Sequence, residues 1–185
     1  MANTCAICGA TINVLQSQKL MDGNYICTKG CRAKGLKYYD YVHSDLDNVK
    51  DHIHQTEVGT KIWQDLMEPL KKTRDKNQKM QSFHPIYIAP SLGLIAVIEA
   101  RGGLFNTKTY ACVYRLENLQ LYRTERMPAR TSGSDKDKMC VHLGFVHTKG
   151  LNDVYIPFDD ETRCHQCVDY LNKLFGLDDS FRSGI

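Results

Sequence analysis

Four cysteines near the start of the chain have the spacing of a metal site. Cys5 and Cys8 are separated by two residues, Cys27 and Cys31 by three, and eighteen residues divide the two pairs. Zinc takes four ligands in a tetrahedron, and structural zinc sites use two short cysteine pairs joined by a loop of this kind. The spacing therefore predicts one structural Zn²⁺ held by these four thiolates. Two disulfides and four free thiols are the alternatives.

The residues around these cysteines predict a small zinc module over residues 1–42. Gly9 suits a tight turn directly after Cys8, and the dipeptide Asp22-Gly23 predicts a two-residue hairpin turn between two short strands. A helix is expected to begin at the second cysteine pair. A turn, a hairpin and a helix in this order describe a treble-clef finger.

The metal is expected to be structural rather than catalytic. A module of about 40 residues rarely folds without disulfides or a bound metal, and a structural zinc contributes on the order of 10 kcal/mol to the stability of the folded state. Four thiolates leave no open coordination position, which a catalytic zinc needs for its water. His43 is the nearest histidine in the sequence, and we expect it to be a solvated side chain rather than a ligand.

A second Cys-x-x-Cys motif, at Cys164 and Cys167, lies near the predicted start of a helix, where the helix dipole lowers the thiol pKa in redox proteins. Eighteen residues follow Cys167, which is too few to complete a thioredoxin-like fold. Acidic residues beside the motif also raise a thiol pKa. Three interpretations remain open: cysteines buried on a helix, thiol redox chemistry, and a second metal site with Cys112, Cys140 or a histidine.

The sequence contains no other catalytic constellation. It lacks a phosphate-binding glycine loop, a nucleophile elbow and a helical His-Glu-x-x-His motif. The adjacent carboxylates at positions 159–161 are expected to stabilise the start of a helix. We therefore expect a protein that is not an enzyme, with thiol redox chemistry at Cys164 and Cys167 as the remaining exception.

Composition indicates a folded protein without a membrane span. The 185 residues are 42% hydrophobic and 24% charged, which is typical of a chain that buries a core. No run reaches the roughly 18 to 20 apolar residues of a span, and the N-terminus lacks the pattern of a secretory signal. These features predict a cytoplasmic location, where paired cysteines bind metal more often than they form disulfides. A net charge of +3 does not indicate nucleic-acid binding by itself.

Residues 43–80 predict a helical connector. Ser44 resembles the first residue of a capping box, and apolar residues share one face on each side of Gly59. The pattern therefore predicts two short amphipathic helices that are divided at Gly59. Trp63, the only tryptophan, is expected to pack against a neighbouring element.

The histidines and lysines of the connector carry weak signals. His52 and His54 are two residues apart, which sends them to different faces of a helix, so joint metal binding is not expected. The basic stretch 71–79 predicts a solvated helix end or linker. A patch that faces phosphate groups is the alternative.

Residues 81–178 predict an antiparallel sheet domain. Short β-branched and aromatic runs, separated by turn signals, predict six or seven strands, and the polar residues 129–138 predict a long exposed loop. A helix is expected to begin with the acidic residues 159–161 and to end at Gly176. A strand meander closed by a C-terminal helix is the layout of a PH-like barrel or sandwich, which makes the whole chain α+β. Residues 179–185 predict a flexible tail.

The whole chain resembles a group of bacterial and phage proteins of unknown function, in which a cysteine-rich treble clef precedes helices and a PH-like or GRAM-like domain. The residues that carry the resemblance are CAICG, DGNYICTKGC, YRLENLQLYRTE and YIPFDDETRCHQCVDYLNKLFG. This chain has three residues between Cys27 and Cys31, where the group commonly has two. The resemblance implies zinc binding and an interaction scaffold, and it implies no known activity.

Three functions follow from these features. The favoured one is a non-enzymatic zinc-binding adaptor that binds a protein partner, such as a host protein if the chain comes from a phage. The first alternative is nucleic-acid binding through the basic stretch 71–79 of the connector and the basic residues of the finger, Lys19, Lys29, Arg32, Lys34 and Lys37. The second is anionic-lipid binding by the PH-like domain through Arg123, Arg126, Arg130 and Lys136.

Overall fold

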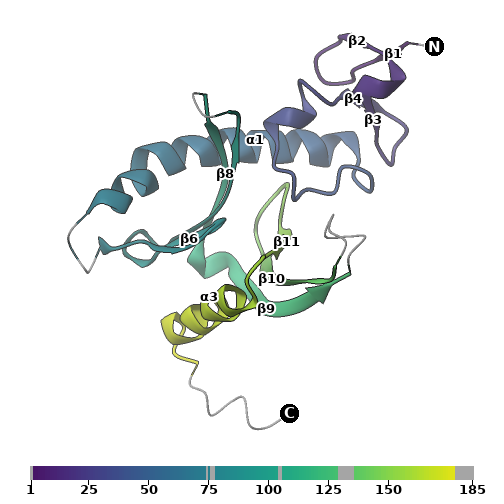
Figure 1. Cartoon of the computed structure of the whole chain (residues 1–185). Coiled ribbons are helices and arrows are strands. Elements are labelled where there is room, and N and C mark those ends of the chain that lie inside the picture. The colour runs from purple at the N-terminus through teal and green to yellow at the C-terminus, as the bar shows by residue number, and fades with distance from the viewer. Residues whose placement is uncertain (1, 74, 76–77, 104–105, 129–135, 178–185) are drawn as a thin grey trace.

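The computed structural model describes residues 2–73, 75, 78–103, 106–128 and 136–177. Most of the predicted loop 129–138 and the predicted tail 179–185 lie outside these residues. The described chain is a mixed α+β structure with several small antiparallel sheets and two α-helices, which confirms the predicted class at this level (Figure 1). We refer to residues 2–42 as the cysteine module, to residues 43–80 as the connector and to residues 81–177 as the sheet domain.

The strands pair in four sheets. The cysteine module contains two strand pairs, β1 (Asn3–Thr4) with β2 (Thr11–Ile12) and β3 (Ser17–Lys19) with β4 (Tyr25–Cys27). A four-stranded sheet follows chain order and contains β5 (Gln81–Phe83), β6 (Ile86–Ala89), β7 (Leu94–Arg101) and β8 (Lys108–Arg115). A three-stranded sheet in the order β11-β10-β9 contains β9 (Leu119–Met127), β10 (Lys138–Phe145) and β11 (Asp153–Pro157). The two α-helices are α1 (Leu46–Ile62) and α3 (Glu161–Leu174).

The four-stranded sheet is buried on both faces. All of β6 and the centre of β7 are buried, which explains why these strands are continuous apolar runs rather than alternating ones. One face shares a core with the three-stranded sheet and α3 through Ile86, Ile88, Ile95 and Val97. The other face packs on the connector through small side chains, Ala89, Ala96 and Ala111. The prediction of six or seven strands is confirmed, with seven.

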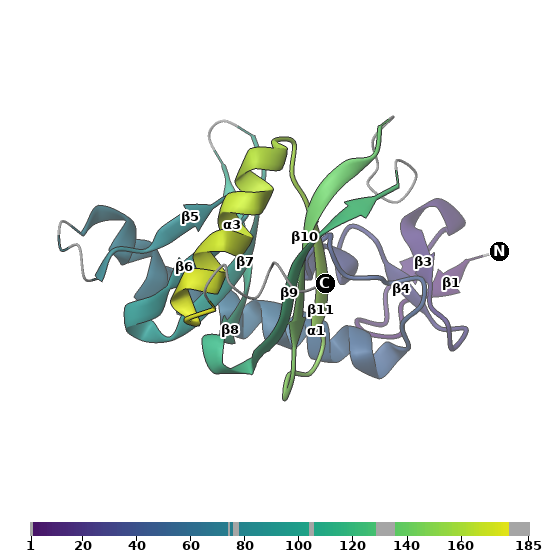
Figure 2. The ribbon, with the colours of Figure 1, turned by 90° about the horizontal axis from the view of Figure 1, so that it is seen from below.

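Helix α3 packs against β5, β9 and β10 (Figure 2). The side chain of Asp160 caps it by accepting a hydrogen bond from the Thr162 N–H, and Gly176 follows its end with a φ of +68°. Its buried face consists of Cys164, Cys167, Val168 and Leu171. Among the described residues, no strand pairing joins the four-stranded sheet to the three-stranded one, so the predicted barrel is not closed.

The connector forms one continuous helical path, so the prediction of two helices divided at Gly59 is wrong. α1 is followed directly by a π-helical turn over Trp63–Met67 and a 3-10 turn over Glu68–Lys72. Gly59 marks a close approach of α1 to β8, because a Cβ atom there would lie 2.4 Å from the Ala111 carbonyl oxygen. The adjacent Thr60 hydroxyl accepts a hydrogen bond from the Ala111 N–H at 3.0 Å. The helix therefore covers the outer edge of β8.

Trp63 anchors the connector on the four-stranded sheet. Its side chain is fully buried, and its ring lies 4.8 Å from the ring of Tyr87 in an edge-to-face arrangement. The Lys71 ammonium lies 4.6 Å from the centre of the Trp63 ring. The prediction that Trp63 packs against a neighbouring element is confirmed.

The two ends of the connector differ in how much the structure describes. At the first end, the Asp45 side chain caps α1, whereas the predicted cap Ser44 donates its hydroxyl to the Asp40 carbonyl oxygen at 2.6 Å. At the second end, residues 74, 76 and 77 of the predicted basic stretch lie outside the described residues. Within the described ranges, no helix combines the length and the apolar character that a bilayer span requires.

Candidate metal centre

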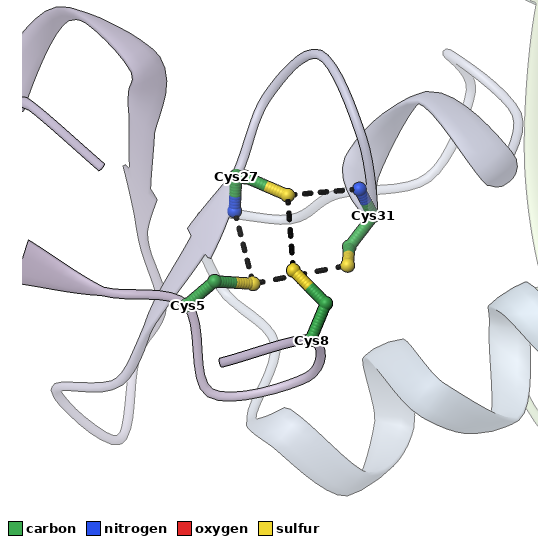
Figure 3. A group of neighbouring side chains, drawn as sticks. All are labelled: Cys5, Cys8, Cys27 and Cys31. Carbon is green, nitrogen blue, oxygen red and sulfur yellow. Dashed lines mark hydrogen bonds between the residues drawn. The ribbon is translucent and has the colours of Figure 1, made fainter. Parts of the chain in front are cut away.

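The four predicted ligands come together in the cysteine module (Figure 3). Cys5 follows β1, Cys8 lies in the turn between β1 and β2, Cys27 ends β4, and Cys31 precedes a 3-10 turn at Arg32–Lys34. Their four sulfur atoms all lie within 4.8 Å of one another. The structure therefore brings these residues close enough to hold one metal ion.

Glycines shape the backbone around the sulfur atoms. Gly9 adopts a φ of +73°, and its N–H donates to the Cys5 carbonyl oxygen at 2.9 Å, which closes the turn that carries the first cysteine pair. At Gly30, a Cβ atom would lie 2.8 Å from the sulfur of Cys27. Glycine at this position therefore leaves room for the ligand atom, and the predicted role of Gly9 in a tight turn is confirmed.

The hairpin that presents Cys27 has a three-residue turn instead of the predicted two-residue turn. The Leu20 N–H donates to the Asn24 carbonyl oxygen at 2.8 Å, and Gly23 takes the left-handed position with a φ of +85°. The Asp22 carboxylate accepts hydrogen bonds from the N–H groups of Asn24 at 3.1 Å and Leu46 at 2.9 Å. This carboxylate therefore ties the hairpin to the start of α1.

The sulfur spacing fits a tetrahedral ion. With zinc–sulfur bonds of about 2.3 Å, the edge of a tetrahedron is about 3.8 Å. The sulfurs of Cys5 and Cys31 lie 3.7 Å apart, and those of Cys8 and Cys27 lie 3.8 Å apart. A disulfide would need about 2.05 Å between two sulfurs. The geometry therefore fits a shared metal ion and does not contain disulfides between these cysteines.

Backbone N–H groups point at the sulfurs and stabilise negative charge there. The Cys27 N–H lies 3.4 Å from the sulfur of Cys5, and the Cys31 N–H lies 3.1 Å from the sulfur of Cys27. Burial acts to raise the pKa of Cys5, but the N–H groups of Cys8, Cys27 and Ile7 outweigh it and lower this pKa to about 6. Burial and the neighbouring sulfurs raise the pKa of Cys31. A bound dication would favour the deprotonated form of all four thiols, including Cys31.

The donor set limits the chemistry of the site. Four thiolates complete a tetrahedral shell, so a bound ion would have no open position for water or substrate. His43 does not approach the sulfurs as a ligand; its side chain is 78% exposed, and its Nδ1 lies 2.6 Å from the Asp40 carboxylate. The prediction that His43 is a solvated side chain is confirmed. The arrangement suits a structural ion, and both zinc and iron accept four thiolates.

The second cysteine motif lies in the core of the sheet domain. Cys164 and Cys167 are fully buried on α3. Burial raises the pKa of Cys164 to about 11 and that of Cys167 to about 12, which is opposite to the lowering that redox thiols show. Among the described residues, no further cluster of three or more potential ligands includes these two thiols, Cys112 or Cys140. The interpretation of buried core cysteines is confirmed.

The helix predicted from Cys31 onward is not formed. Arg32–Lys34 make a single 3-10 turn, and the chain leaves helical geometry at Gly35, whose ψ is 171°. A Cβ atom at Gly35 would lie 2.3 Å from the Tyr41 hydroxyl oxygen. The chain is extended at this glycine, and the next residue, Leu36, contacts the connector.

The contact between the cysteine module and the connector centres on a histidine that sequence reasoning missed. Buried His52 accepts a hydrogen bond at Nε2 from the Leu36 N–H at 2.9 Å, and its ring stacks on Tyr39 at 4.2 Å. Burial lowers the pKa of His52 to about 4, so the imidazole is neutral and can accept this bond. A Cβ atom at Gly35 would lie 2.6 Å from Cδ2 of this ring, and one at Gly150 would lie 2.8 Å from the Cα atom of the same residue. These two glycines were the available sequence signal for a close contact.

An ion pair fixes the same segment to the sheet domain. Arg101 at the end of β7 donates to the carbonyl oxygens of Ala33 and Gly35, each at 2.5 Å. Glu99 pairs with Arg101 at 2.7 Å and accepts a hydrogen bond from the Lys37 N–H, also at 2.7 Å. The backbone that follows the metal centre is therefore held by side chains of β7. We call these contacts, together with those of His52, the module interface.

A groove of about 610 Å³ lies between the cysteine module and the three-stranded sheet. Its walls come from both parts of the molecule, namely residues 37–40, residues 125–128, Cys140, Tyr155 and Pro157. β11, which contributes the last two residues, is an edge strand, and no described segment pairs with its outer side. No family model, curated protein or solved structure matches the chain.

Proposed function

We propose that residues 1–42 form a treble-clef zinc finger with one structural Zn²⁺ bound by Cys5, Cys8, Cys27 and Cys31. The glycine turn, the β3–β4 hairpin and the single 3-10 turn follow the order of that finger, with the last helix shortened. The sulfur spacing supports a tetrahedral ion. Elemental analysis of the purified protein tests the identity of the metal: one zinc per chain is expected, and iron would contradict the proposal.

We also propose that the sheet domain is PH-like. Four strands, then three strands, then a C-terminal helix on the core give the order of elements expected for that fold. The same order supports the resemblance to the bacterial and phage proteins that combine a treble clef with a PH-like or GRAM-like domain. An experimental structure would test it, and a sheet arrangement without a shared core between the two sheets would overturn it.

The function that these features support best is a cytoplasmic, non-enzymatic adaptor that binds a protein partner. The groove between the cysteine module and the three-stranded sheet carries this proposal, because it exists only when both parts are in place. None of the four ligand cysteines lines the groove, so a bound metal would order the module that carries residues 37–40 and would supply no chemistry, since four thiolates leave no open position. The module interface then holds residues 37–40 opposite Tyr155 and Pro157.

An extended peptide suits this groove. The unpaired outer side of β11 offers backbone N–H and C=O groups for strand addition, and pockets beside it would take alternate side chains. Tyr38, Tyr39 and Tyr155 supply aromatic contact area, the kind that is enriched at protein interfaces. The partner class is therefore a protein with an exposed extended segment.

A photo-crosslinking experiment tests this function. A photoreactive amino acid in place of Lys37, which lines the groove, should capture a specific partner from the native cell, to be identified by mass spectrometry. The same amino acid in place of Lys61, an exposed lysine on α1, is the matched control and should not capture it. Capture from neither position would contradict the protein-partner function.

The metal ligands provide the second arm of the test. The double variant Cys5→Ser/Cys27→Ser should lose metal and lose the crosslink from position 37, because residues 37–40 depend on the module that the metal holds. A crosslink that survives loss of metal would place partner binding on the sheet domain alone. It would then contradict a groove built from two parts.

Nucleic-acid binding is the second candidate, and one observation favours it. Asp22 is the only acidic residue among the first 37 and stands against five basic residues there, so the side chains of this segment other than the ligand thiolates carry a positive charge. Binding that falls steeply between about 50 and 200 mM salt would support this candidate. Lipid binding by the sheet domain ranks lower, because Arg123 is paired with Glu125.

A further inference from the structure

The cysteine module carries two apolar side chains in water at the turn between β2 and β3. Leu15 is 94% exposed and Val14 is 66% exposed, and Leu15 is the most exposed large hydrophobic side chain of the described residues. The 3-10 turn that bears them, Val14–Gln16, belongs to the part of the molecule that projects away from α3 (Figures 1 and 2). We call this turn the apolar tip.

The apolar tip is held by hydrogen bonds rather than left loose. The Asn13 side chain accepts from the Gln16 N–H at 3.0 Å, and the Ser17 hydroxyl donates to the Val14 carbonyl oxygen at 3.0 Å. The Gln16 carbonyl oxygen accepts from the Thr28 N–H at 2.9 Å. These polar groups of the turn are satisfied internally, so moving the tip out of water does not strip them of partners.

The charges beside the apolar tip are positive. Lys29 follows Thr28, which is bonded to the tip, and Lys19 lies two residues beyond Ser17 on β3. Both lysine side chains are exposed. The nearest acidic residue in the sequence, Asp22, is also exposed, and its carboxylate accepts hydrogen bonds from the side chain of Asn24 and the N–H of Leu46. Two exposed lysines against one exposed carboxylate leave the surroundings of the apolar tip with a net positive charge.

We propose that the apolar tip inserts into the interfacial layer of an anionic lipid bilayer, with Lys19 and Lys29 against the headgroups. Apolar side chains next to lysines are the combination that binds anionic membrane surfaces, and it acts through both hydrophobic insertion and electrostatic attraction. This surface is separate from the groove proposed for a protein partner. The inference therefore goes beyond the adaptor function and does not depend on it.

Size favours a bilayer over another protein as the occupant. A stable protein interface buries about 800 Å² on each partner and has a packed apolar centre. Two side chains on one turn fall short of that area, and the same limit disfavours a second copy of this chain. A bilayer needs only a small apolar wedge and nearby cations, since the lipid supplies the remaining contact.

Vesicle co-sedimentation of the full, metal-loaded chain tests the proposal. The protein should bind vesicles of phosphatidylcholine mixed with phosphatidylserine more tightly than vesicles of phosphatidylcholine alone. Val14→Ser/Leu15→Ser should weaken binding to the mixed vesicles by about tenfold or more, because two apolar side chains no longer leave water. Lys19→Glu/Lys29→Glu should weaken it to a similar degree and remove the preference for the anionic lipid.

Matched variants distinguish insertion of the apolar tip from non-specific hydrophobic binding to vesicles. Val58→Ser/Leu66→Ser removes the same two residue types from exposed positions of the connector, where they are 42% and 52% exposed, and should leave vesicle binding unchanged. Bound metal should stay at one equivalent in every variant, which shows that the cysteine module remains folded. Equal binding of the tip variant and the wild-type chain would overturn the proposal. The proposal would also be overturned if the wild-type chain self-associated without lipid and Val14→Ser/Leu15→Ser abolished that association.

The vesicle-binding test and the photo-crosslinking test of the adaptor function can fail independently of each other. The tip variant should keep the photo-crosslink from position 37, because the apolar tip does not line the groove. Loss of that crosslink together with unchanged vesicle binding would assign the tip to the protein partner and overturn membrane insertion.

Discussion

The cysteine module and the sheet domain reach a fixed structure by different means. The sheet domain buries large aliphatic side chains between two sheets and α3, such as Ile86, Ile95, Leu143 and Leu171. The cysteine module buries four aliphatic side chains, Ile12, Leu20, Ile26 and Leu36, together with the two cysteines Cys5 and Cys31 and the rings of Tyr39 and Tyr41. So few apolar groups cannot offset the entropy of ordering this segment.

The difference shows what each part depends on. In the sheet domain, stability is spread over many contacts, so the loss of one side chain costs a few kcal/mol. In the cysteine module, we expect it to be concentrated in four sulfur–metal bonds, which act together or not at all. The module interface links the cysteine module to the rest of the molecule, because His52 and Arg101 bind backbone groups that follow Cys31.

Removal of the metal should give the largest effect. A chelator, or the variant Cys5→Ser, should unfold the cysteine module and leave the sheet domain folded, because a structural zinc contributes on the order of 10 kcal/mol to a module of this size. Amide spectra of the ¹⁵N-labelled protein should lose dispersion for residues 3–31 and keep it for β6, β7 and β10. Elemental analysis should report the loss of metal in parallel.

A thiol of the sheet domain provides the control for that experiment. Cys164→Ala removes a fully buried cysteine from α3, and bound metal should remain at one equivalent. A metal-free protein whose module amides keep their positions would contradict metal dependence and would remove the contrast between the two regions.

Truncation of Trp63 should have the next largest effect, confined to the sheet domain and connector. Trp63→Ala should lower the free energy of unfolding by about 3 to 5 kcal/mol, because the side chain is fully buried against Tyr87. Trp63→Phe should cost less, since the indole N–H has no hydrogen-bond partner to lose. Denaturant unfolding followed by circular dichroism measures both values.

An exposed neighbour on the same helical turn is the matched control. Leu66→Ala should change the free energy of unfolding by less than about 0.5 kcal/mol, because Leu66 is 52% exposed. Metal content should be unchanged in all three variants. A Trp63→Ala protein that loses its metal would show that the two regions fold as one unit.

Acid should weaken the module interface through His52. The pKa of this histidine falls from an ordinary value of 6.5 to about 4 in the folded chain, so the unfolded state binds the proton first as pH drops. The unfolded state then holds more protons than the native state, and stability falls between pH 6.5 and pH 4. The full loss is about 3 kcal/mol at 1.36 kcal/mol per pKa unit, and none of it applies above pH 7.

A variant isolates this contribution from acid release of the metal. His52→Leu should lower stability at pH 7, because the N–H of Leu36 loses its acceptor, and should flatten the difference in stability between pH 7 and pH 5. Acid effects on the cysteines occur in both proteins and cancel in the comparison. Equal pH slopes for the two proteins would contradict the role assigned to His52.

Features set by local spacing could be predicted from the sequence. The four cysteines, the tight turn at Gly9, the strands from β6 to β11 and the two ends of α3 follow from residues within a few positions of one another. The cysteine distances in particular are a short-range pattern, because four ligands must reach one point. These elements were found where the sequence placed them.

Features set by contacts between distant segments could not be predicted. The chain leaves helical geometry at Gly35, which lies against Tyr41 and against His52 of the connector. The backbone of His52 likewise lies against Gly150, almost one hundred residues away. In the local sequence pattern a glycine predicts the end of a helix, whereas in this structure Gly35 and Gly150 allow two segments of the chain to approach closely.

Gly59 gives the smallest effect and the sharpest test of that distinction. At an exposed position of a helix, Gly→Ala stabilises the protein by about 0.5 to 1 kcal/mol, because alanine gives the unfolded chain fewer conformations to lose on folding. At Gly59 the added Cβ would lie 2.4 Å from the Ala111 carbonyl oxygen and 2.9 Å from the Val113 nitrogen, both backbone atoms of β8. Gly59→Ala should therefore lower the free energy of unfolding by about 1 to 3 kcal/mol, since α1 must move off the sheet edge. Denaturant unfolding decides the sign, and a stabilised variant would show that α1 does not pack on β8 as closely as the Thr60 contact requires.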